Sequence, residues 1–304
     1  MGSPVGLPRL VRFKLGAIRG FHHLLLRVLG LGALYVLARG FGTLEYLLSG
    51  SRRKRFGRRL ERVFGRELPA AERRRHTRNH MARIRADKTF YTVMDLIPRD
   101  RLGALIQWTG REHLDASIAR GKGTYILFSH HGSHHVGGLL LAMAGYRDLA
   151  AIRDPHESPL RRYIQEQFAQ TFPEFRENCR IFMAGTFPRE LFRHFKKNGV
   201  LGSGLDVDRI RGENVKTARV QLFGQEHEWM TGTVNLALRT GATIVPGFVL
   251  SEPGFRYRLL FKPPLCDPDQ SKDDEATVQR VMEAYARGIE EHVQRYPEHI
   301  SRTK

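Results

Sequence analysis

The strongest constraint on the fold is a regular alternation in the part of the chain that follows Leu105. Short apolar runs, of a length suited to strands, are separated by longer amphipathic segments that suit helices. The predicted strands are 124–129, 149–152, 180–183, 200–205, 243–250 and 257–261, and the predicted helices include 137–144, 159–168, 187–197, 231–240 and 275–296. Strands interleaved with helices predict an α/β fold, with a largely parallel sheet flanked by helices.

The first hundred residues differ from the rest in charge. Residues 1–100 contain 22 Lys and Arg against 7 Asp and Glu, whereas residues 101–304 contain 28 against 24. We therefore expect an N-terminal, membrane-associating basic helical region over 1–100 and an α/β domain over 101–304. So concentrated a positive charge fits a polyanionic partner, such as an anionic membrane surface or an acidic protein.

An apolar segment, residues 21–48, precedes the most basic part of this region. Arg27, Arg39 and Glu45 interrupt it, and its longest uncharged run has 11 residues, fewer than the roughly 20 that span a bilayer. An amphipathic or partly inserted helix on anionic lipid is therefore expected rather than a clean transmembrane helix. A solvated helical pair packed on the domain is the alternative. Nucleic acid is not an expected partner, because the basic residues lack interleaved aromatic side chains.

Polar side chains follow three of the predicted strands. The segment ILFSHHGSHHVGGLLL, residues 126–141, carries four histidines within six positions, Arg153 follows the next strand, and DVDR, residues 206–209, follows strand 200–205. Ligands of open α/β sheets bind beyond the carboxyl ends of strands, so these groups converge in one cleft if the three strands are neighbours. A histidine at a strand end suits general base catalysis, provided that a second group orients its ring.

The histidines also form two pairs with helical i,i+4 spacing, His130/His134 and His131/His135, which could chelate zinc. Gly132 and the end of the strand argue against a helix through the whole cluster, and no third ligand follows from the spacing. The two cysteines of the chain are not clustered. Neither a metal nor a cofactor is therefore expected.

Several of these segments resemble the lysophospholipid acyltransferase superfamily, and most closely its bacterial lipid A biosynthesis (late) acyltransferases. SHHGSHHVGG is similar to the first motif of the family, in which a catalytic His is followed, after four intervening residues, by Asp or Glu. AIRDPHESPLRRYI, GVLGSGLDVDR and VQLFGQEHEWMTGTVNLALRTGATIVPGFV are similar to later blocks of the family, in the same order and spacing. The resemblance extends from about Gly110 to Pro264.

The resemblance implies transfer of a fatty acyl group from an acyl thioester, on acyl carrier protein or CoA, to a hydroxyl or amine of a lipid-linked acceptor. It also implies a peripheral or monotopic enzyme on the cytoplasmic face of a bacterial inner membrane. His130 would be the general base and Arg153 would bind an anionic group of the substrate. The other candidate residues implied are Asp206 and Asp208 for positioning the acceptor or the base, and Gly132, Ser133 and Arg209 for substrate binding.

His135 stands where the motif of the family has its acidic residue, and it cannot supply a permanent negative charge. In one interpretation the protein is an active acyltransferase, in which neutral His135 orients His130, or Asp206 or Asp208 supplies the missing carboxylate. In another it is a degenerate member of the family that binds lipid or acyl carrier protein without turnover. A metal site on the histidines and a different acceptor chemistry are further alternatives.

Overall fold

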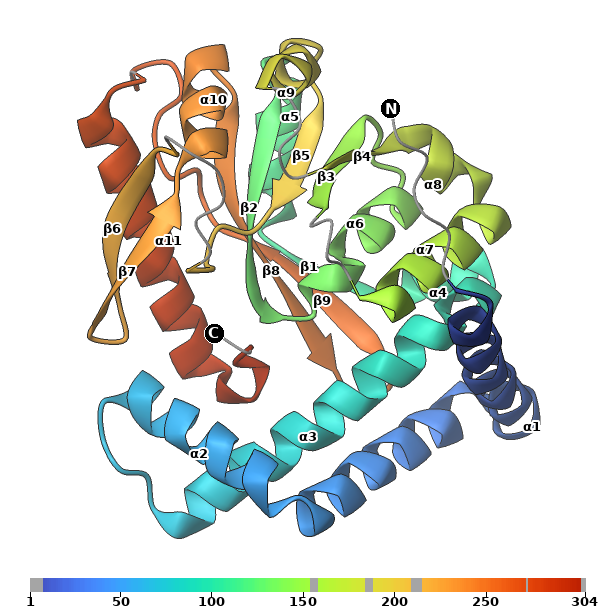
Figure 1. Cartoon of the computed structure of the whole chain (residues 1–304). Helices are drawn as coiled ribbons and strands as arrows, with labels where there is room; N and C mark the ends of the chain where they lie inside the picture. Colours follow the sequence, from blue (N-terminus) through green and yellow to red (C-terminus); the bar gives the residue numbers. More distant parts are fainter. Residues whose placement is uncertain (1–7, 154–157, 184–187, 209–214, 272, 302–304) are drawn as a thin grey trace.

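The structure is a computed structural model, and it describes residues 8–153, 158–183, 188–208, 215–271 and 273–301. The strands are β1 (Ile106–Thr109), β2 (Thr124–Gly132), β3 (Leu149–Arg153), β4 (Cys179–Met183), β5 (Val200–Ser203), β6 (Thr217–Leu222), β7 (Gln225–Met230), β8 (Thr243–Glu252) and β9 (Arg256–Phe261). Seven of them form one sheet in the order β1-β9-β8-β2-β5-β3-β4 (Figure 1). Strands β8, β2, β5, β3 and β4 are mutually parallel, whereas β9 pairs antiparallel with β8 and parallel with β1.

The helices of the α/β part are α4 (Arg99–Ala104), α5 (Arg111–Ala119), α6 (His134–Met143), α7 (Pro159–Thr171), α8 (Pro173–Asn178), α9 (Pro188–Lys196), α10 (Gly232–Thr240) and α11 (Glu275–Arg295). The expected fold class is confirmed, and each predicted strand and helix has its counterpart in the structure. Helix α6 begins three residues earlier than predicted, so it includes His134 and His135. Strand β1 and the antiparallel hairpin of β6 and β7 were not predicted, because they contain no apolar run.

Strand β2 explains why the sheet is buried on both faces. Its side chains alternate between the two faces, as in any strand. Ile126 and Phe128 belong to one apolar cluster, with side chains of α6 and α7, while Tyr125 and Leu127 belong to a second, with side chains of α9, α10 and α11. The sheet is thus the middle layer of three, and its strand ends are the points at which polar groups emerge.

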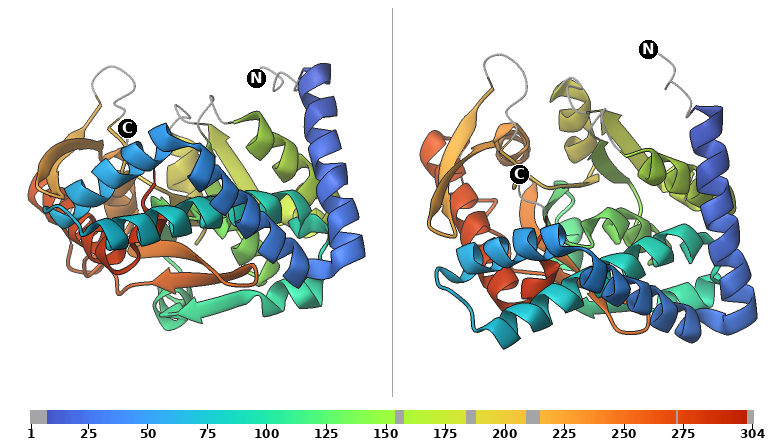
Figure 2. Two further views of the ribbon diagram at one scale, coloured as in Figure 1. Left: turned by 90° about the horizontal axis from the view of Figure 1, so that it is seen from below. Right: turned by 60° about the horizontal axis from the view of Figure 1, so that its bottom comes forward.

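Three long helices form the N-terminal region: α1 (Arg9–Leu48), α2 (Gly50–Phe64) and α3 (Ala70–Val93). The backbone of α1 departs from helical geometry at Gly30, with φ 74° and ψ 173°, so the helix consists of two arms that meet at a bend (Figure 2). Leu34 and Ala38 of the second arm are buried in the core, with Phe90 of α3. The N-terminal helices therefore share apolar contacts with the α/β part, and the boundary near residue 100 remains a prediction.

Among the described residues, α1 is the one helix long and apolar enough to cross a membrane, by length and composition. The expectation from sequence was based on the length of uncharged runs, whereas this finding is based on the mean hydropathy of the whole bent helix. Both arms expose large apolar side chains, including Phe13, Val28 and Val36, which are 76%, 70% and 66% exposed. An exposed apolar surface of this kind marks an interaction with a membrane or a partner.

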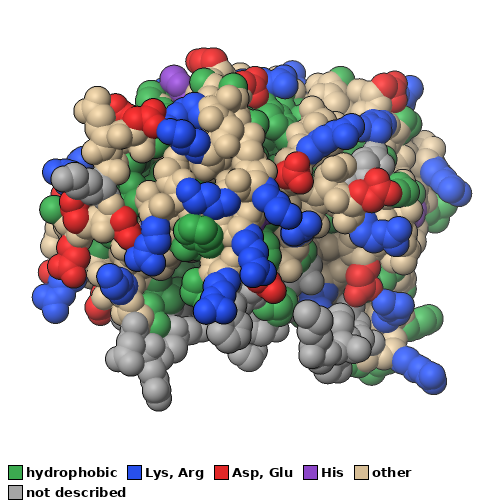
Figure 3. Space-filling view, turned by 90° about the horizontal axis from the view of Figure 1, so that it is seen from above, with side chains coloured by type: hydrophobic (Ala, Val, Ile, Leu, Met, Phe, Trp, Pro, Cys, Tyr) green, Lys and Arg blue, Asp and Glu red, His purple; other side chains and the backbone are tan. Residues whose placement is uncertain are grey.

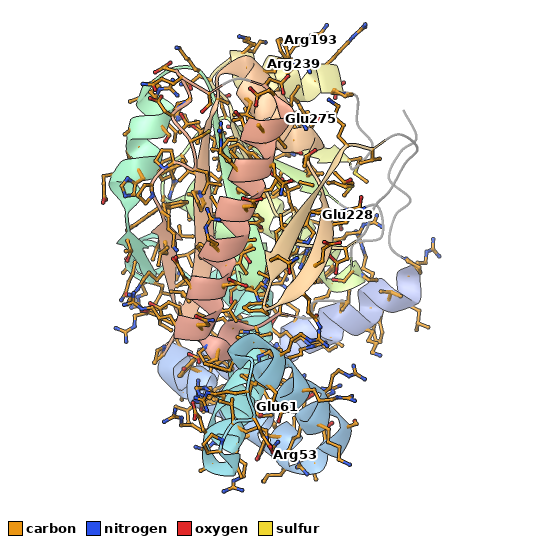
Figure 4. All side chains as sticks on the ribbon, turned by 90° about the vertical axis from the view of Figure 1, so that its left-hand side faces the viewer. Arg53, Glu61, Arg193, Glu228, Arg239 and Glu275 are labelled. Atoms are coloured by element: carbon orange, nitrogen blue, oxygen red, sulfur yellow. The ribbon has the colours of Figure 1, made fainter. Side chains whose placement is uncertain are left out.

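Charge is distributed unevenly between the two ends of the molecule. Helix α2 carries seven Lys and Arg and one acidic residue, Glu61. Figure 4 shows Arg53 and Glu61 of this helix at the end opposite to Arg193 and Arg239. The face seen from above in Figure 3 mixes basic and acidic side chains. The excess of positive charge is thus located on the N-terminal helices, which lie beyond the carboxyl ends of β2 and β8 (Figure 1).

Candidate active site

The three strands that were expected to carry polar groups are neighbours, in the order β2-β5-β3. His130 lies near the end of β2, Asp206 follows β5, and Arg153 is the last residue of β3. The convergence inferred from the sequence therefore holds for these strand ends. The side chain of Arg153 and the whole of Arg209 lie outside the described residues.

His130 and Asp206 are in direct contact. The Nδ1 atom of His130 lies 2.6 Å from Oδ1 of Asp206, and the backbone N–H of His130 donates to Oδ2 of the same carboxylate at 2.8 Å. The hydroxyl of Ser129 also donates to this carboxylate at 2.8 Å. The hydroxyl of Tyr285 lies 3.1 Å from the carboxylate and 2.7 Å from the carbonyl oxygen of Phe128, so its one proton is shared between the two acceptors. The Asp206 side chain is fully buried, so the desolvation of its charge is compensated by four donors.

The electrostatics of the pair favour ionisation of both groups. Burial acts to lower the pKa of His130, but the charge and the hydrogen bond of Asp206 outweigh it and raise this pKa above its usual value. Burial acts to raise the pKa of Asp206, but the charge and hydrogen bond of His130 outweigh it, so this pKa lies well below its usual range. Asp206 is therefore a carboxylate at neutral pH, and it stabilises the protonated form of His130.

The geometry also fixes which nitrogen of His130 is available. When the neutral ring donates from Nδ1 to Asp206, the lone pair is on Nε2. Among the described residues, Nε2 of His130 has no hydrogen-bond partner, and the side chain is 33% exposed. An imidazole held in this way can accept a proton from a bound hydroxyl or amine.

Glycine at position 204 allows this close packing. A Cβ atom there would lie 2.7 Å from Cε1 of His130 and 2.8 Å from the carbonyl oxygen of Phe128. Both distances are shorter than real Cβ contacts, so only glycine leaves room for the ring. Gly204 and Tyr285 were not among the candidates from sequence. Gly204 could have been suspected from its place two residues before Asp206, whereas Tyr285 is 79 residues away and gave no signal.

His135 does not contact His130 through a hydrogen bond. Its ring packs edge-on against Tyr91, with centroids 5.1 Å apart, at the start of α6. Burial lowers the pKa of His135 to about 4, so the ring is neutral at pH 7. The ring nearest to His130 is that of His134, with centroids 4.7 Å apart. The arrangement therefore brings Asp206, and not His135, to the ring of His130.

The substrate-binding candidates Gly132, at the end of β2, and Ser133, just after it, make close contacts inside the protein. Gly132 has φ of 99°, and a Cβ atom there would lie 2.3 Å from the carbonyl oxygen of Val249, so this turn requires glycine. The hydroxyl of Ser133 donates to Asp87 of α3 at 2.6 Å. Asp87 also forms a buried ion pair with Arg83 at 2.7 Å. Ser133 thus joins the loop after His130 to the N-terminal helices.

Asp208 points to another histidine. Its carboxylate lies 2.9 Å from Nδ1 of His227 and accepts a hydrogen bond from the indole N–H of Trp229 at 3.2 Å, both on β7. The two acidic candidates, Asp206 and Asp208, are therefore separated by the structure. Asp206 belongs to the site of His130, and Asp208 to the hairpin.

The histidine cluster does not form the helical pairs on which a metal site would depend. His130 and His131 are in β2, whereas His134 and His135 begin α6. The buried ring of His131 accepts a hydrogen bond at Nδ1 from the backbone N–H of Ser301. In the part of the chain that the structure describes, no group of three His, Cys, Asp or Glu side chains is placed to hold a metal ion.

Comparisons with known proteins identify the family of the chain. A search of curated proteins finds no match. A model of the bacterial lipid A biosynthesis acyltransferase family matches residues 13–299, which include all of the sheet, the His130 and Asp206 pair and nearly all of the three N-terminal helices. The chain is therefore a member of the bacterial lipid A biosynthesis acyltransferase family.

Proposed function

We propose that the protein is a membrane-associated acyltransferase, which moves a fatty acyl group from an acyl thioester to a hydroxyl or amine of a lipid-linked acceptor. The thioester is carried by acyl carrier protein or by CoA. The observation that carries the proposal is the contact of His130 with the buried carboxylate of Asp206, at the ends of neighbouring strands. Membership in an acyltransferase family supports the reaction class.

In the proposed reaction, Nε2 of His130 takes the proton of the acceptor hydroxyl or amine while the acceptor atom attacks the thioester carbonyl carbon. A bond from carbon to the acceptor oxygen or nitrogen forms, and the carbon–sulfur bond then breaks. The departing thiolate receives the proton from His130. Asp206 acts as the positioning carboxylate, since it orients the ring and stabilises the imidazolium.

The remaining candidates keep the roles that the resemblance implies. Arg153, at the end of β3, would bind a phosphate or another anion of the substrate through its forked donors. Arg209 would assist it, and Gly132 and Ser133 would shape the loop that faces the acceptor. Asp208, paired with His227, would act on the acceptor rather than on His130.

We further propose that the enzyme lies on the cytoplasmic face of a bacterial inner membrane. The exposed apolar side chains of α1 and the basic residues of α2 support this location, because each basic residue near an anionic surface contributes roughly 1 kcal/mol. Acyl carrier protein and acyl-CoA are available on that face. The same positive charge suits an acidic carrier protein.

The function is tested by acyl transfer in vesicles of bacterial phospholipid extract, with acyl carrier protein and CoA thioesters supplied separately. The His130→Ala variant is expected to lose about 10³-fold or more in rate. His113→Ala in α5 is the matched control, since it removes a half-buried histidine from a helix that carries no candidate site residue. If wild type transfers acyl groups and His130→Ala does so at the same rate, the assignment of His130 as the general base is wrong. Vesicle binding without transfer from either donor would favour the non-catalytic lipid or carrier-protein binding module.

A further inference from the structure

The proposed acyl transfer creates a negative charge that none of the roles assigned above compensates. When the acceptor attacks the thioester, the carbonyl oxygen takes the π electrons of its bond and becomes an oxyanion. His130 holds the proton of the acceptor, and Asp206 is occupied with Nδ1 of His130. A hydrogen-bond donor for the oxyanion must lie beside the base, because one carbon atom bonds both the attacking atom and this oxygen.

The histidine ring that lies beside the base is that of His134. Its centroid is 4.7 Å from that of His130, and the planes are inclined by 67°, so the edge of one ring faces the other. His134 is the first residue of α6, which begins two residues after the end of β2 (Figure 1). The turn at Gly132 thus places one ring at a strand end and one at a helix start next to each other. The ring of His135 packs on Tyr91 instead.

The hydrogen bonding of His134 indicates which of its nitrogens faces a ligand. Among the described residues, Nδ1 of His134 is buried and has no hydrogen-bond partner. A buried acceptor without a partner is tolerated more often than a buried N–H group without one, so the proton of the neutral ring belongs on Nε2. His134 as a whole is partly exposed, and with Nδ1 buried a ligand reaches the ring at Nε2.

His134 is neutral at pH 7. Burial lowers its pKa well below the usual value, and the positive charges of protonated His130 and of Arg161 act in the same direction, against a smaller effect of Asp206. The N-terminus of α6 also disfavours a cation at its first residue. A neutral imidazole of this kind donates a hydrogen bond and does not compete with the base for the proton of the acceptor.

We propose that His134 is a second catalytic residue of this site, whose Nε2–H donates a hydrogen bond to the oxyanion of the acyl group. This inference rests on the proposed function, because it assigns the fate of the carbonyl oxygen in that reaction. The acceptor atom bonds to the carbonyl carbon while His130 takes its proton, and the carbon–oxygen π electrons move to the oxygen. When these electrons return, the carbon–sulfur bond breaks and the departing thiolate takes the proton from His130. The proton of His134 stays on Nε2 throughout.

Substitutions at position 134 separate a donor from a packing residue. His134→Phe keeps the shape of the ring and removes the N–H. The amide nitrogen of His134→Gln reaches approximately the place of Nε2, whereas that of His134→Asn reaches only the place of Nδ1. His135→Phe is the matched control, because it makes the same change in the neighbouring ring that packs on Tyr91.

We expect His134→Phe to lower kcat for acyl transfer about 10²-fold, the usual effect of losing one oxyanion donor, with KM for the acceptor changed by less than about twofold. His134→Gln should recover the rate to within about tenfold of wild type, and His134→Asn should not. A packing role predicts the opposite order, with Phe as the best replacement. Equal rates for the Phe and Gln variants, or a Phe variant as fast as wild type, would overturn the inference.

A binding experiment tests the same donor without turnover. The probe is the monomethyl ester of dodecylphosphonic acid, a tetrahedral anion that resembles the intermediate, and methyl laurate is its planar, uncharged counterpart. By calorimetry in a mild detergent, wild type should bind the phosphonate about tenfold more tightly than His134→Phe does, with His134→Gln between them, and should bind methyl laurate as each variant does.

The two measurements also separate this inference from the proposed function. Equal affinities of wild type and His134→Phe for the phosphonate would contradict the inference, whether or not the protein transfers acyl groups. A phosphonate that distinguishes the variants, in a protein that transfers no acyl group from either donor, would contradict the proposed transfer and not the assignment of His134 as a donor.

Discussion

His130, on the strand side of the histidine cluster, and His134 and His135, on its helix side, have the same kind of side chain and opposite electrostatics. On the strand side, at the ends of β2 and β5, His130 contacts the buried carboxylate of Asp206, and this contact raises the pKa of His130. On the helix side, at the start of α6, burial lowers the pKa of His134 well below its usual value and that of His135 to about 4. Only the strand side holds a charge that stabilises a protonated imidazole.

The difference shows that the carboxylate in contact with His130, the proposed general base, comes from the segment after a neighbouring strand instead of from the same motif. The motif that this segment resembles has its acid after four intervening residues, which corresponds to position 135. In this chain that position, His135, packs against Tyr91, and a carboxylate at Asp206 reaches Nδ1 of His130 from β5. What matters chemically is a buried, hydrogen-bonded carboxylate at that nitrogen, whatever its place in the sequence.

The largest expected effect is on the strand side, where Gly204→Ala would force the His130 ring to move. The added Cβ atom meets the ring at 2.7 Å, and a misplacement of about 1 Å costs roughly 10²-fold in rate. The measurement is kcat/KM for acyl transfer, with folding followed by thermal unfolding. Gly138→Ala in α6 is the control, because a Cβ atom there meets nothing within 4 Å. Equal rates in the two variants would show that the ring is not held as described.

The buried histidines whose pKa is lowered, on the helix side and elsewhere, predict acid lability. His135 and the buried His131 have pKa values lowered to about 4, and His292 to about 3, whereas an unfolded histidine titrates near 6.5. Between pH 6.5 and 4 the unfolded chain therefore binds more protons, and stability falls as the pH falls. From pH 7.5 to 5 each of these three histidines should lower the free energy of unfolding by roughly 2 kcal/mol, about 6 kcal/mol together, as measured by urea titration. The raised pKa of His130 opposes this trend, so a stability that increases toward pH 5 would mean that the strand side dominates.

A smaller effect is expected at Tyr285, which connects α11 to the strand side. Tyr285→Phe removes the hydroxyl whose proton is shared between Asp206 and the carbonyl oxygen of Phe128, at most about 1 kcal/mol for Asp206, so kcat should fall by up to about fivefold with KM for the acceptor unchanged. Tyr125→Phe removes an equally buried hydroxyl that bonds Ser203 at 2.8 Å, and should leave kcat unchanged. If both variants lose the same activity, the effect of Tyr285 is one of general stability rather than of positioning.

The sequence could predict the elements of this fold because its apolar runs are local features. Residues 124–129 and 243–250 are apolar and buried on both faces, and both were expected as strands. The hairpin of β6 and β7 was missed, since its strands alternate apolar with charged residues and β7 is largely polar. The bend of α1 at Gly30 was also missed, because that glycine lies in an otherwise continuous helical pattern.

The site could be predicted only in part, because some of its contacts join residues that are far apart in the sequence. His130, Asp206 and Asp208 were all candidates, because each follows an apolar run. The choice between the two aspartates depends on the direction of each side chain after β5, and the sequence does not encode that locally. The pairing of β2 with β5 and the contact of Tyr285 with Asp206 join residues far apart in the sequence, so no spacing rule indicates them.

The central claim is that Asp206, and not the residue at position 135, is the carboxylate partner of His130. The most direct test measures kcat/KM for acyl transfer by Asp206→Asn and His135→Phe in the same vesicles. Asp206→Asn keeps the shape but removes the charge and should lose between about 10² and 10⁴ in rate, while His135→Phe keeps the contact with Tyr91 and should stay within about threefold of wild type. A large loss in His135→Phe with near-normal turnover in Asp206→Asn would contradict the account.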